Sequence, residues 1–245
     1  MRILTTAAVL ALSSAGPAFA ADLSAKPWGK APHAVAASSG WTGFYVGGTV
    51  GGGFANAPSD FSVAGGPVFG TAPNSPRGVL GGVQAGYNWQ NGSIVYGIET
   101  DFQFTGMSDK VQTPCPAGVC GVPIQASYGH DIDWFGTARG RIGYAGDNWM
   151  IYATGGYAYA RLSTTAIATA GATEAIAKWN DTRGGWTMGG GIEVAINRQW
   201  SVKAEYLYAD LGRFDQSWTV APLPTILDQT RLDMNIVRVG VNYRF

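Results

Sequence analysis

His130 is the residue of this sequence best placed to do chemistry, because Ser127 and Asp131 lie close to it in the chain. A histidine that activates a serine and is oriented by a carboxylate is the arrangement of a serine hydrolase, and these groups must then be in hydrogen-bond contact. Here all three residues come at or before the start of an extended segment, and no matching partner on a neighbouring segment is evident. We therefore interpret His130 as a solvated loop histidine. We predict that the protein is not an enzyme and has no catalytic, cofactor-binding or metal-binding residue.

The first twenty residues have the features of a secretory signal peptide. Arg2 precedes an apolar run from Ala7 to Leu12, and the small-residue triplet Ala18-Phe19-Ala20 follows. Cleavage after this triplet would leave a mature chain that starts at Ala21. A chain exported in this way meets an oxidising compartment, in which disulfides form and persist.

The two cysteines, Cys115 and Cys120, lie in one short segment, TPCPAGVC. In an exported chain this proximity predicts a local disulfide. A redox-active or metal-binding pair is disfavoured, because four residues rather than two separate the cysteines and His130 is the only histidine nearby.

The composition is poor in charge for a soluble domain. Charged residues make up 13% of the chain, against roughly 25% in an average soluble domain. The 16 basic and 16 acidic residues balance, so no basic excess would attract nucleic acid. No stretch after the signal approaches the roughly 20 consecutive apolar residues of a membrane-crossing helix, which excludes a helical membrane protein. Residues 1–20 are thus expected to be a signal peptide, 21–40 a flexible segment and 41–245 one domain.

Most of the remaining sequence alternates between apolar and polar residues with a period of two, which in a strand sends each set to one face. Each alternating segment has about the 9 to 11 residues that a tilted strand needs to cross a bilayer, or slightly more. Short connections with turn residues, such as Asn91-Gly92, alternate with four long ones over 55–77, 105–131, 160–184 and 210–231. The predicted strands are Trp41 to Phe54, Gly78 to Trp89, Ser93 to Phe104, Ile132 to Tyr144, Trp149 to Tyr159, Gly185 to Ile196, Trp200 to Ala209 and Leu232 to Phe245.

One face of these strands carries no charge, and its aromatic residues gather near the strand ends. Trp89, Tyr144 and Trp149 mark one rim, while Trp134 and Tyr208 mark the other. Two aromatic belts around an aliphatic middle are typical of a barrel in a bilayer, because amphipathic rings favour the two interfaces. We therefore predict that the apolar face points outward into lipid and that the charged face points into a lumen.

Backbone polar groups in lipid must be paired within the protein, and strands achieve this only by closing into a barrel. Eight strands enclose an interior that side chains can fill. The predicted fold is an all-β, eight-stranded antiparallel up-and-down transmembrane barrel. Five acids and five bases lie on its inward face, and their pairing would make the lumen a polar plug rather than a wide channel. This predicted charge network comprises Glu99, Asp101, Asp133, Arg139, Arg141, Glu193, Lys203, Glu205, Arg238 and Arg244.

Seven stretches of the chain also carry a family likeness. They are WTGFYVGG (41–48), QAGYNWQ (84–90), WFGTARGRIGYA (134–145), WMIYATGGYAYA (149–160), GWTMGGGIE (185–193), WSVKAEYLYADLG (200–212) and VRVGVNYRF (237–245). Together they resemble the alphaproteobacterial outer-membrane immunogenic proteins, the RopB-like family of small barrels, over nearly the whole mature chain.

The resemblance implies localisation in the cell outer membrane of a Gram-negative bacterium. The four long loops would be extracellular, and the three short turns and both termini, including segment 21–40, would be periplasmic. The resemblance also implies that Phe245, a terminal aromatic residue, is the signal by which the barrel-assembly machinery recognises the chain.

We predict a non-enzymatic surface protein with a structural role in envelope integrity and with antigenic, interacting loops. The expected partners are outer-membrane lipid and lipopolysaccharide, the barrel-assembly machinery, and a host or environmental ligand at the long loops. Two alternatives stay open. One is a narrow porin-like pore for small solutes, which needs a continuous water path past the charge network. The other is a haem-binding surface protein, because haem binding is attributed to relatives and an exposed His130 could ligate iron.

Overall fold

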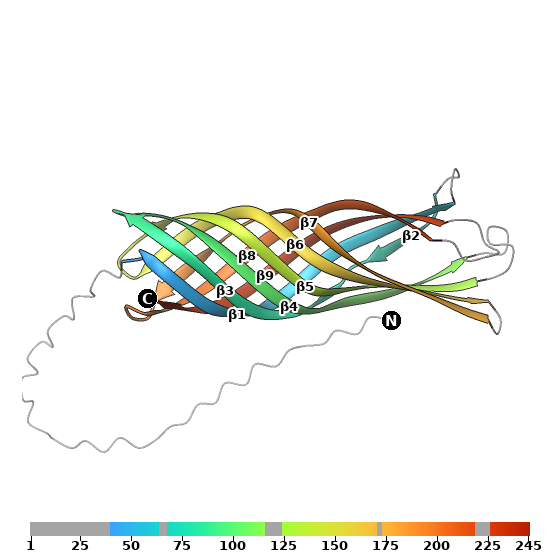
Figure 1. The fold of residues 1–245 in the computed structure, drawn as a ribbon, viewed down its shortest axis with the longest axis horizontal. Helices are drawn as coiled ribbons and strands as arrows, with labels where there is room; N and C mark the ends of the chain where they lie inside the picture. The colour runs from blue at the N-terminus through green and yellow to red at the C-terminus, as the bar shows by residue number, and fades with distance from the viewer. Residues whose placement is uncertain (1–39, 64–67, 116–123, 171–172, 219–225) are drawn as a thin grey trace, which may run out of the picture. The chain divides into compact units, whose positions relative to one another are not determined.

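The computed structural model describes residues 40–63, 68–115, 124–170, 173–218 and 226–245. These residues form antiparallel β-strands that wind around a common axis (Figure 1). Within these ranges no helix is long and apolar enough to cross a membrane. The strands are β1 (Gly43–Val63), β2 (Val68–Asn74), β3 (Arg77–Asn91), β4 (Ile94–Cys115), β5 (Ile124–Ala145), β6 (Trp149–Ala170), β7 (Thr173–Ala195), β8 (Trp200–Trp218) and β9 (Ile226–Arg244).

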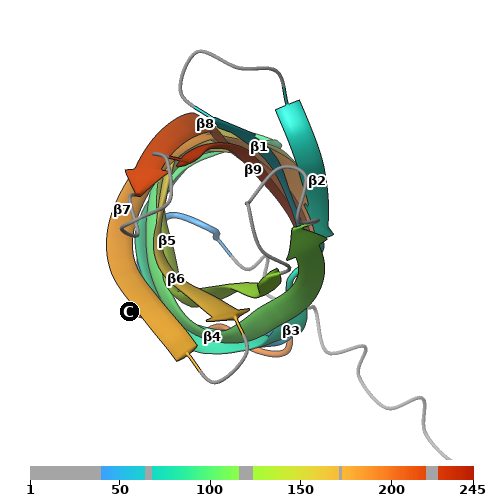
Figure 2. The same cartoon turned by 90° about the vertical axis from the view of Figure 1, so that its right-hand side faces the viewer.

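Eight of the strands close into a barrel. β1 and β3 to β9 pair in chain order, and β9 pairs with β1 through a ladder that places Val50 opposite Val239. Figure 2 looks along this barrel and shows its strands as a closed ring. β2 pairs with the part of β1 that lies beyond the barrel wall, and it is not part of the ring. The predicted eight-stranded antiparallel barrel is confirmed.

The strands are longer than the sequence pattern predicts. The three short connections lie where they are expected, and Gly92 in the first of them has a φ of 60°, which glycine adopts without strain. Most residues of the four long connections, however, belong to strands. β4 and β5 stay paired out to Cys115 opposite Ile124, and β6 and β7 stay paired out to Ala170 opposite Thr173. Small and polar residues dominate these extensions, so their composition suggests loops although the ladder continues.

Beyond the barrel wall the strand extensions separate into two sheets. β7 pairs with β8 only up to Trp186 opposite Asp210, and β3 pairs with β4 only up to Arg77 opposite Ser108. A bulge between Asp210 and Arg213 interrupts the pairing of β8 with β9, and bulges of this kind bend a strand. We define outer sheet A as residues 109–115, 124–132, 161–170 and 173–185 of β4 to β7. We define outer sheet B as residues 57–63, 68–74, 211–218 and 226–232 of β1, β2, β8 and β9.

The barrel wall is apolar outside and charged inside. Ile142 on the outer face is 60% exposed, whereas Lys203 on the inner face is only 1% exposed. Outward aromatic rings contact one another at the predicted rims, as in the pair Trp134 and Tyr159, whose centroids are 5.8 Å apart. The predicted direction of the two faces is therefore confirmed.

Candidate functional site

The candidate site is a cluster of charged side chains in the barrel lumen. The period-two alternation of the strands places them, because each lies one residue away from a side chain that points outward. Each of the residues in this cluster is at most 5% exposed. We call the cluster the lumen network, and it consists of Glu99, Asp101, Arg139, Arg141, Glu193, Lys203, Glu205 and Arg238.

Arg139 contacts three carboxylates at the centre of the network. It lies opposite Glu99 across β4 and β5 and forms an ion pair with it. Its Nη2 atom is 3.0 Å from Asp101 Oδ2, and its Nη1 atom is 3.1 Å from Glu205 Oε1. Since β5 and β8 are not neighbours in the sheet, the contact with Glu205 crosses the lumen. The rigid fork of a guanidinium suits such simultaneous contacts.

Arg238 and Lys203 complete the centre of the network. Arg238 Nη2 lies 2.6 Å from Glu205 Oε2 and 3.0 Å from Asp101 Oδ2. Lys203 Nζ lies 3.0 Å from Glu99 Oε2 and 3.7 Å from Glu205 Oε1. Each of the three carboxylates thus faces at least two cations, which offsets the cost of removing the charges from water.

Tyrosines link the centre of the network to Arg141. Arg141 Nη2 is 2.9 Å from Glu193 Oε2, and its guanidinium carbon lies 4.0 Å from the centre of the Tyr152 ring. Arg141 Nη1 donates to the Tyr45 hydroxyl at 3.1 Å, and this hydroxyl donates in turn to Glu99 Oε2 at 2.7 Å. The Tyr152 hydroxyl donates to Glu205 Oε1 at 3.0 Å, so the two tyrosine hydroxyl groups satisfy carboxylate lone pairs that the cations leave free.

The lumen network is electrically balanced, because four carboxylates face four cations. A single buried charge without a partner would cost several kcal/mol, whereas a paired and hydrogen-bonded set can be accommodated. The network is thus a unit, and removal of one member leaves a charge of the opposite sign unpaired.

Arg244, a predicted member, lies apart from the network near the short turns. It donates to the carbonyl oxygens of Gly40 at 3.2 Å and of Asn197 at 3.1 Å. Its guanidinium carbon is 4.6 Å from the centre of the Trp41 ring. Arg244 is buried, and the two carbonyl groups and the ring take the place of water around its guanidinium group.

The prediction that Asp133 points into the lumen is wrong. β5 has a bulge against β6 between Ile132 and Trp134, and Asp133 is the extra residue. The extra residue shifts the in-and-out alternation by one. Even-numbered residues before the bulge and odd-numbered residues after it therefore share the inward face. The side chain of Asp133 is 42% exposed, lies 3.7 Å from Arg161 and accepts a hydrogen bond from Ser163 at 2.6 Å.

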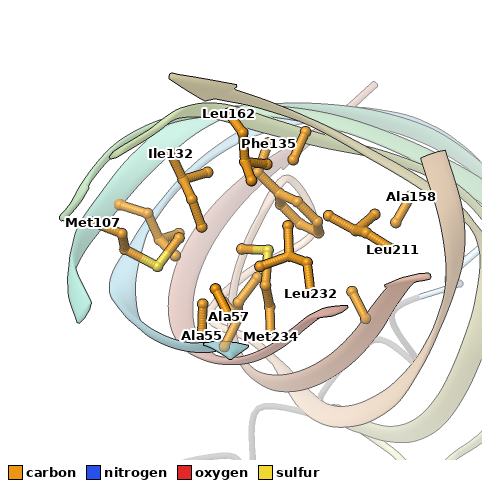
Figure 3. Packing of buried hydrophobic residues seen from close by; sticks show 14 of the residues in the cluster. Ala55, Ala57, Met107, Ile132, Phe135, Ala158, Leu162, Leu211, Leu232 and Met234 are labelled. Atoms are coloured by element: carbon orange, nitrogen blue, oxygen red, sulfur yellow. The ribbon is translucent and has the colours of Figure 1, made fainter. Parts of the chain in front are cut away.

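An apolar layer lies in the lumen on the outer side of the network, towards the outer sheets. Figure 3 shows that side chains from different strands point toward one another there, among them Phe135, Leu162, Leu211, Leu232 and Met234. None of these five residues is more than 3% exposed. Paired charges are thus not the only side chains in the lumen, because an apolar layer adjoins them. We call this layer the outer apolar layer.

A second, smaller apolar cluster lies on the side of the short turns and contains Trp41. Trp41 is fully buried and belongs to one cluster with Val95, Met150 and Tyr152. Its backbone N–H donates to Gln90 Oε1 at 2.7 Å, which fixes the entry of the chain into β1. The lumen network therefore lies between two apolar layers.

The interpretation of His130 as a solvated loop histidine is also wrong. His130 lies in β5 beyond the aromatic rim at Trp134 and is fully buried. Its Nε2 atom is 3.4 Å from Ser59 Oγ on β1, and its Nδ1 atom is 3.1 Å from Thr164 Oγ1 on β6. Burial lowers the pKa of His130 to about 4, although the carboxylate of Asp109 opposes this effect. The imidazole is therefore neutral at pH 7.

Ser127 and Asp131 do not assemble with His130. They lie three residues and one residue away from it along β5, so their side chains point to the opposite face of the strand. Ser59 and Thr164, which do contact His130, could not be identified from sequence because they are far away in the chain.

The terminal Phe245 is 76% exposed on the outside of the barrel. Its N–H donates to the carbonyl oxygen of Phe44 at 3.0 Å, and its ring centroid is 6.1 Å from that of Phe44. Cys115 is the last residue of β4, but Cys120 lies outside the described residues, and so does the predicted disulfide. The predicted signal peptide and residues 21–39 also lie outside them.

Comparison with known proteins finds similarity along nearly the whole chain. Residues 5–245 match the family model described as outer membrane protein beta-barrel domain. The 31 kDa outer-membrane immunogenic protein of Brucella melitensis is 38% identical over 212 residues, which cover 84% of each chain. The 25 kDa outer-membrane immunogenic protein of Brucella abortus is 27% identical and covers 99% of this chain and 97% of its own length. The outer membrane protein OprG from Pseudomonas aeruginosa shares the fold, with a TM-score of 0.55 at 15% identity over 85% of this chain and 98% of its own.

Proposed function

The chain belongs to the family of outer-membrane β-barrel proteins, and on that basis we propose that it is a non-enzymatic surface barrel with a closed lumen. It is located in the outer membrane, and its relatives include proteins named as outer-membrane immunogens. In this proposal the barrel contributes to the integrity of the envelope and presents its outer sheets at the cell surface.

The filling of the lumen carries this proposal. The eight side chains of the lumen network are paired with one another, some between neighbouring strands and some across the lumen, as Arg139 is with Glu205. An ion that entered would have to separate such pairs and then cross the outer apolar layer around Phe135. Conduction requires a hydrated path with sites that bind an ion weakly enough to release it. The arrangement supports a barrel that is stabilised from within rather than one that conducts.

One observation favours the alternative of a narrow pore. Gln84 Oε1, Asp101 Oδ1 and Gln103 Nε2 are buried and have no hydrogen-bond partner among the described residues. Their side chains lie on the inward faces of β3 and β4, and buried polar atoms of this kind recruit water. A water path along them would have to continue past Leu80 and Met107, which are buried and apolar. For this reason the closed lumen is preferred.

The proposal excludes catalysis and haem binding at His130. The side chains of Ser127 and Asp131 point to the other face of β5, so a hydrolytic site does not form around this histidine. Both ring nitrogens contact hydroxyl groups of Ser59 and Thr164 inside the protein, and iron would have to displace one of them. A buried imidazole of this kind is a poor surface ligand for haem.

The proposed partners follow from the two ends of the barrel wall. Arg161 and Arg231 have side chains that are 43% and 46% exposed just beyond the outer aromatic rim. This is the level at which phosphates of lipopolysaccharide would lie, and exposed guanidinium groups bind phosphate well. At the other end the exposed ring of Phe245 is the group that the barrel-assembly machinery would recognise. A host or environmental ligand would meet the outer sheets.

Planar-bilayer recording tests the closed lumen. The purified protein is expected to give no unitary current steps at neutral pH, while a porin of known conductance serves as the positive control in the same membrane. Steady unitary currents that change when Arg139 or Glu193 is replaced would overturn the closed lumen, because they would place the network in an ion path.

The structural role needs its own experiment. A strain that lacks the protein is expected to be more sensitive to detergent, and expression of the unmodified chain should restore resistance. Unchanged detergent sensitivity in the deletion strain would contradict a role in envelope integrity, whatever the bilayer recordings show.

A further inference from the structure

Outer sheets A and B are joined across the lumen by His130. Outer sheet A contributes His130 from β5 and Thr164 from β6, and outer sheet B contributes Ser59 from β1 and Thr230 from β9. Ser59 Oγ is 3.4 Å from His130 Nε2 and 2.7 Å from Thr230 Oγ1. Since β1 and β5 are not neighbours in the sheet, this contact spans the interior.

Among the residues that the structure describes, no ladder hydrogen bonds join the two outer sheets at this level. The ladder between β7 and β8 ends at Trp186 opposite Asp210, before the outer sheets begin. Besides the His130 contact, a polar link joins outer sheet A to the residue that follows β2, because the backbone N–H of Ser75 donates to Asp109 Oδ2 at 2.6 Å. In the described part of the chain, contacts made by side chains therefore join the two outer sheets.

We propose that the Ser59–His130 contact is an acid-sensitive latch, and that protonation of His130 releases outer sheet A from outer sheet B. The latch acts at the outer end of the barrel, so the inference does not depend on whether the lumen conducts.

The groups around His130 explain why its charge matters. Among the described side chains, β1 and β6 contact the ring through the hydroxyl groups of Ser59 and Thr164, and β9 adds the Thr230 hydroxyl next to Ser59. On β5 the ring of Tyr128 packs against the imidazole edge to face, with centroids 4.8 Å apart.

The carboxylate that faces His130 comes from β4, because Asp109 is its cross-strand partner. Asp109 already accepts hydrogen bonds from the backbone N–H groups of Ser75 and Lys110. A protonated His130 would thus be a buried cation whose nearest counter-charge is already engaged, and such a charge is costly.

The sign of the pH effect follows from the pKa of His130. Burial lowers this pKa from 6.5 to about 4 in the closed form, while a solvated imidazole in the open form would keep the ordinary value. The latch is at full strength above pH 6.5 and weakens as the pH falls from about 6.5 to about 4. When His130 is fully protonated, the equilibrium between closed and open has shifted by about 300-fold towards open.

Histidine NMR measures the titration directly. The chain has two histidines, so the variant His33→Ala leaves a single imidazole signal from His130. In lipid nanodiscs this signal is expected to titrate well below pH 6. Titration near pH 6.5 would overturn the latch, because it would show that closure does not disfavour the charged form.

The opening is measured with two spin labels on the full chain. Thr165→Cys and Gln229→Cys place the labels one residue from Thr164 and Thr230, on the outward faces of sheets A and B, in a background with Cys115→Ser and Cys120→Ser. The distance between the labels is expected to be constant above pH 6.5 and to lengthen towards pH 4. A distance that stays constant while His130 becomes protonated would overturn the proposal.

His130→Phe is the control for other acids that titrate in the same range. Phenylalanine keeps the packing against Tyr128 but carries no proton, so the distance should no longer depend on pH. His130→Gln, which keeps polar contacts to Ser59, provides the same comparison if the phenylalanine variant does not fold. Acid opening that persists with the same midpoint in a folded variant would assign the effect to another group, such as Asp109, and overturn the role of His130.

Discussion

Glu205 and Arg238 lie opposite each other across β8 and β9, and Arg238 Nη2 is 2.6 Å from Glu205 Oε2. Their neighbours Tyr206 and Val237 are also opposite each other, but these side chains are 47% and 55% exposed on the outer face. One register therefore brings the ion pair together inside and the apolar pair together outside. A slip of the register by one residue would reverse both faces at once, so the pair helps to specify the fold as well as to fill the lumen.

Glu205→Ala is expected to lower the free energy of unfolding by about 3–5 kcal/mol. The change removes the carboxylate that Arg139, Lys203 and Arg238 share, in a place that is shielded from water. Urea unfolding in lipid vesicles, followed by tryptophan fluorescence, measures the loss. The double variant Glu205→Gln with Lys203→Met restores the balance of charge and should recover part of it.

Asp133→Ala is the matched control for Glu205→Ala. It also removes one carboxylate with an arginine partner, but the side chains of Asp133 and Arg161 are 42% and 43% exposed. An exposed ion pair contributes about 0–1 kcal/mol, so the loss should be no larger than that. Equal losses for the two variants would contradict the view that the members of the lumen network are buried and depend on one another.

Trp41→Ala is expected to cost about 3–5 kcal/mol of unfolding free energy, which is typical of a buried tryptophan replaced by alanine. Trp41 is fully buried among Val95 and Met150, and the change also removes the ring beneath Arg244. Trp149→Ala, at a lipid-facing position that is 38% exposed, should cost less.

Planar-bilayer recording of Trp41→Ala tests whether Trp41 by itself prevents ion conduction through the lumen. The variant is expected to remain non-conducting, because the lumen network and the outer apolar layer are still in place. Unitary currents in this variant would show that Trp41 alone closes the barrel on the side of the short turns.

Gly212→Ala is expected to cost about 1–2 kcal/mol through the backbone alone. Gly212 lies in the bulge of β8 with a φ of 80°, and no heavy atom would lie within 4 Å of an added Cβ. Gly52→Ala is the control, since Gly52 has no positive φ and the nearest atom would be 3.9 Å away. Both variants can be compared by urea unfolding, and a neutral Gly212→Ala would mean that the bulge tolerates another backbone conformation.

The closed barrel could be predicted from the sequence because two physical rules act on every strand. Alternation assigns each side chain to a face, and the pairing requirement in lipid forces closure. The length of the strands could not be predicted in the same way. Outside the bilayer the outward positions no longer need to be apolar, so segments such as 161–170 and 173–185 lose the pattern although their backbones remain paired.

The lumen could be predicted only where alternation is unbroken. The alternation predicts the wrong face for Asp133 because a bulge adds one residue, and the adjacent pair Trp134-Phe135, with one ring on each face, is a trace of that bulge in the sequence. Once β5 is known to extend beyond this bulge, His130 can be placed inside the barrel. It lies two residues from the inward Ile132 along the strand and therefore points to the same face. The outer apolar layer left a similar signal in Leu232, Met234 and Ile236, which alternate on the inward face of β9.

Val239→Arg tests the direction of the whole barrel wall. Val239 is 51% exposed on the outer face of β9, with Val50 and Ala204 as its cross-strand neighbours. An arginine at the middle of the bilayer costs about 2–4 kcal/mol, whereas one near the interface costs about 0–1 kcal/mol. Val79→Arg supplies the second case, because Val79 is 73% exposed on β3 close to the outer sheets.

The two arginine variants should therefore differ by about 2–3 kcal/mol in urea unfolding from lipid vesicles. The depth of the site is the only feature expected to separate them, since both replace an outward valine and neither touches the lumen network. Replacement of the bilayer by a detergent with short chains should reduce the difference, because water reaches the middle of the wall more easily. Equal costs in lipid would mean that Val239 does not face hydrocarbon, and the assignment of the outer face would then fail.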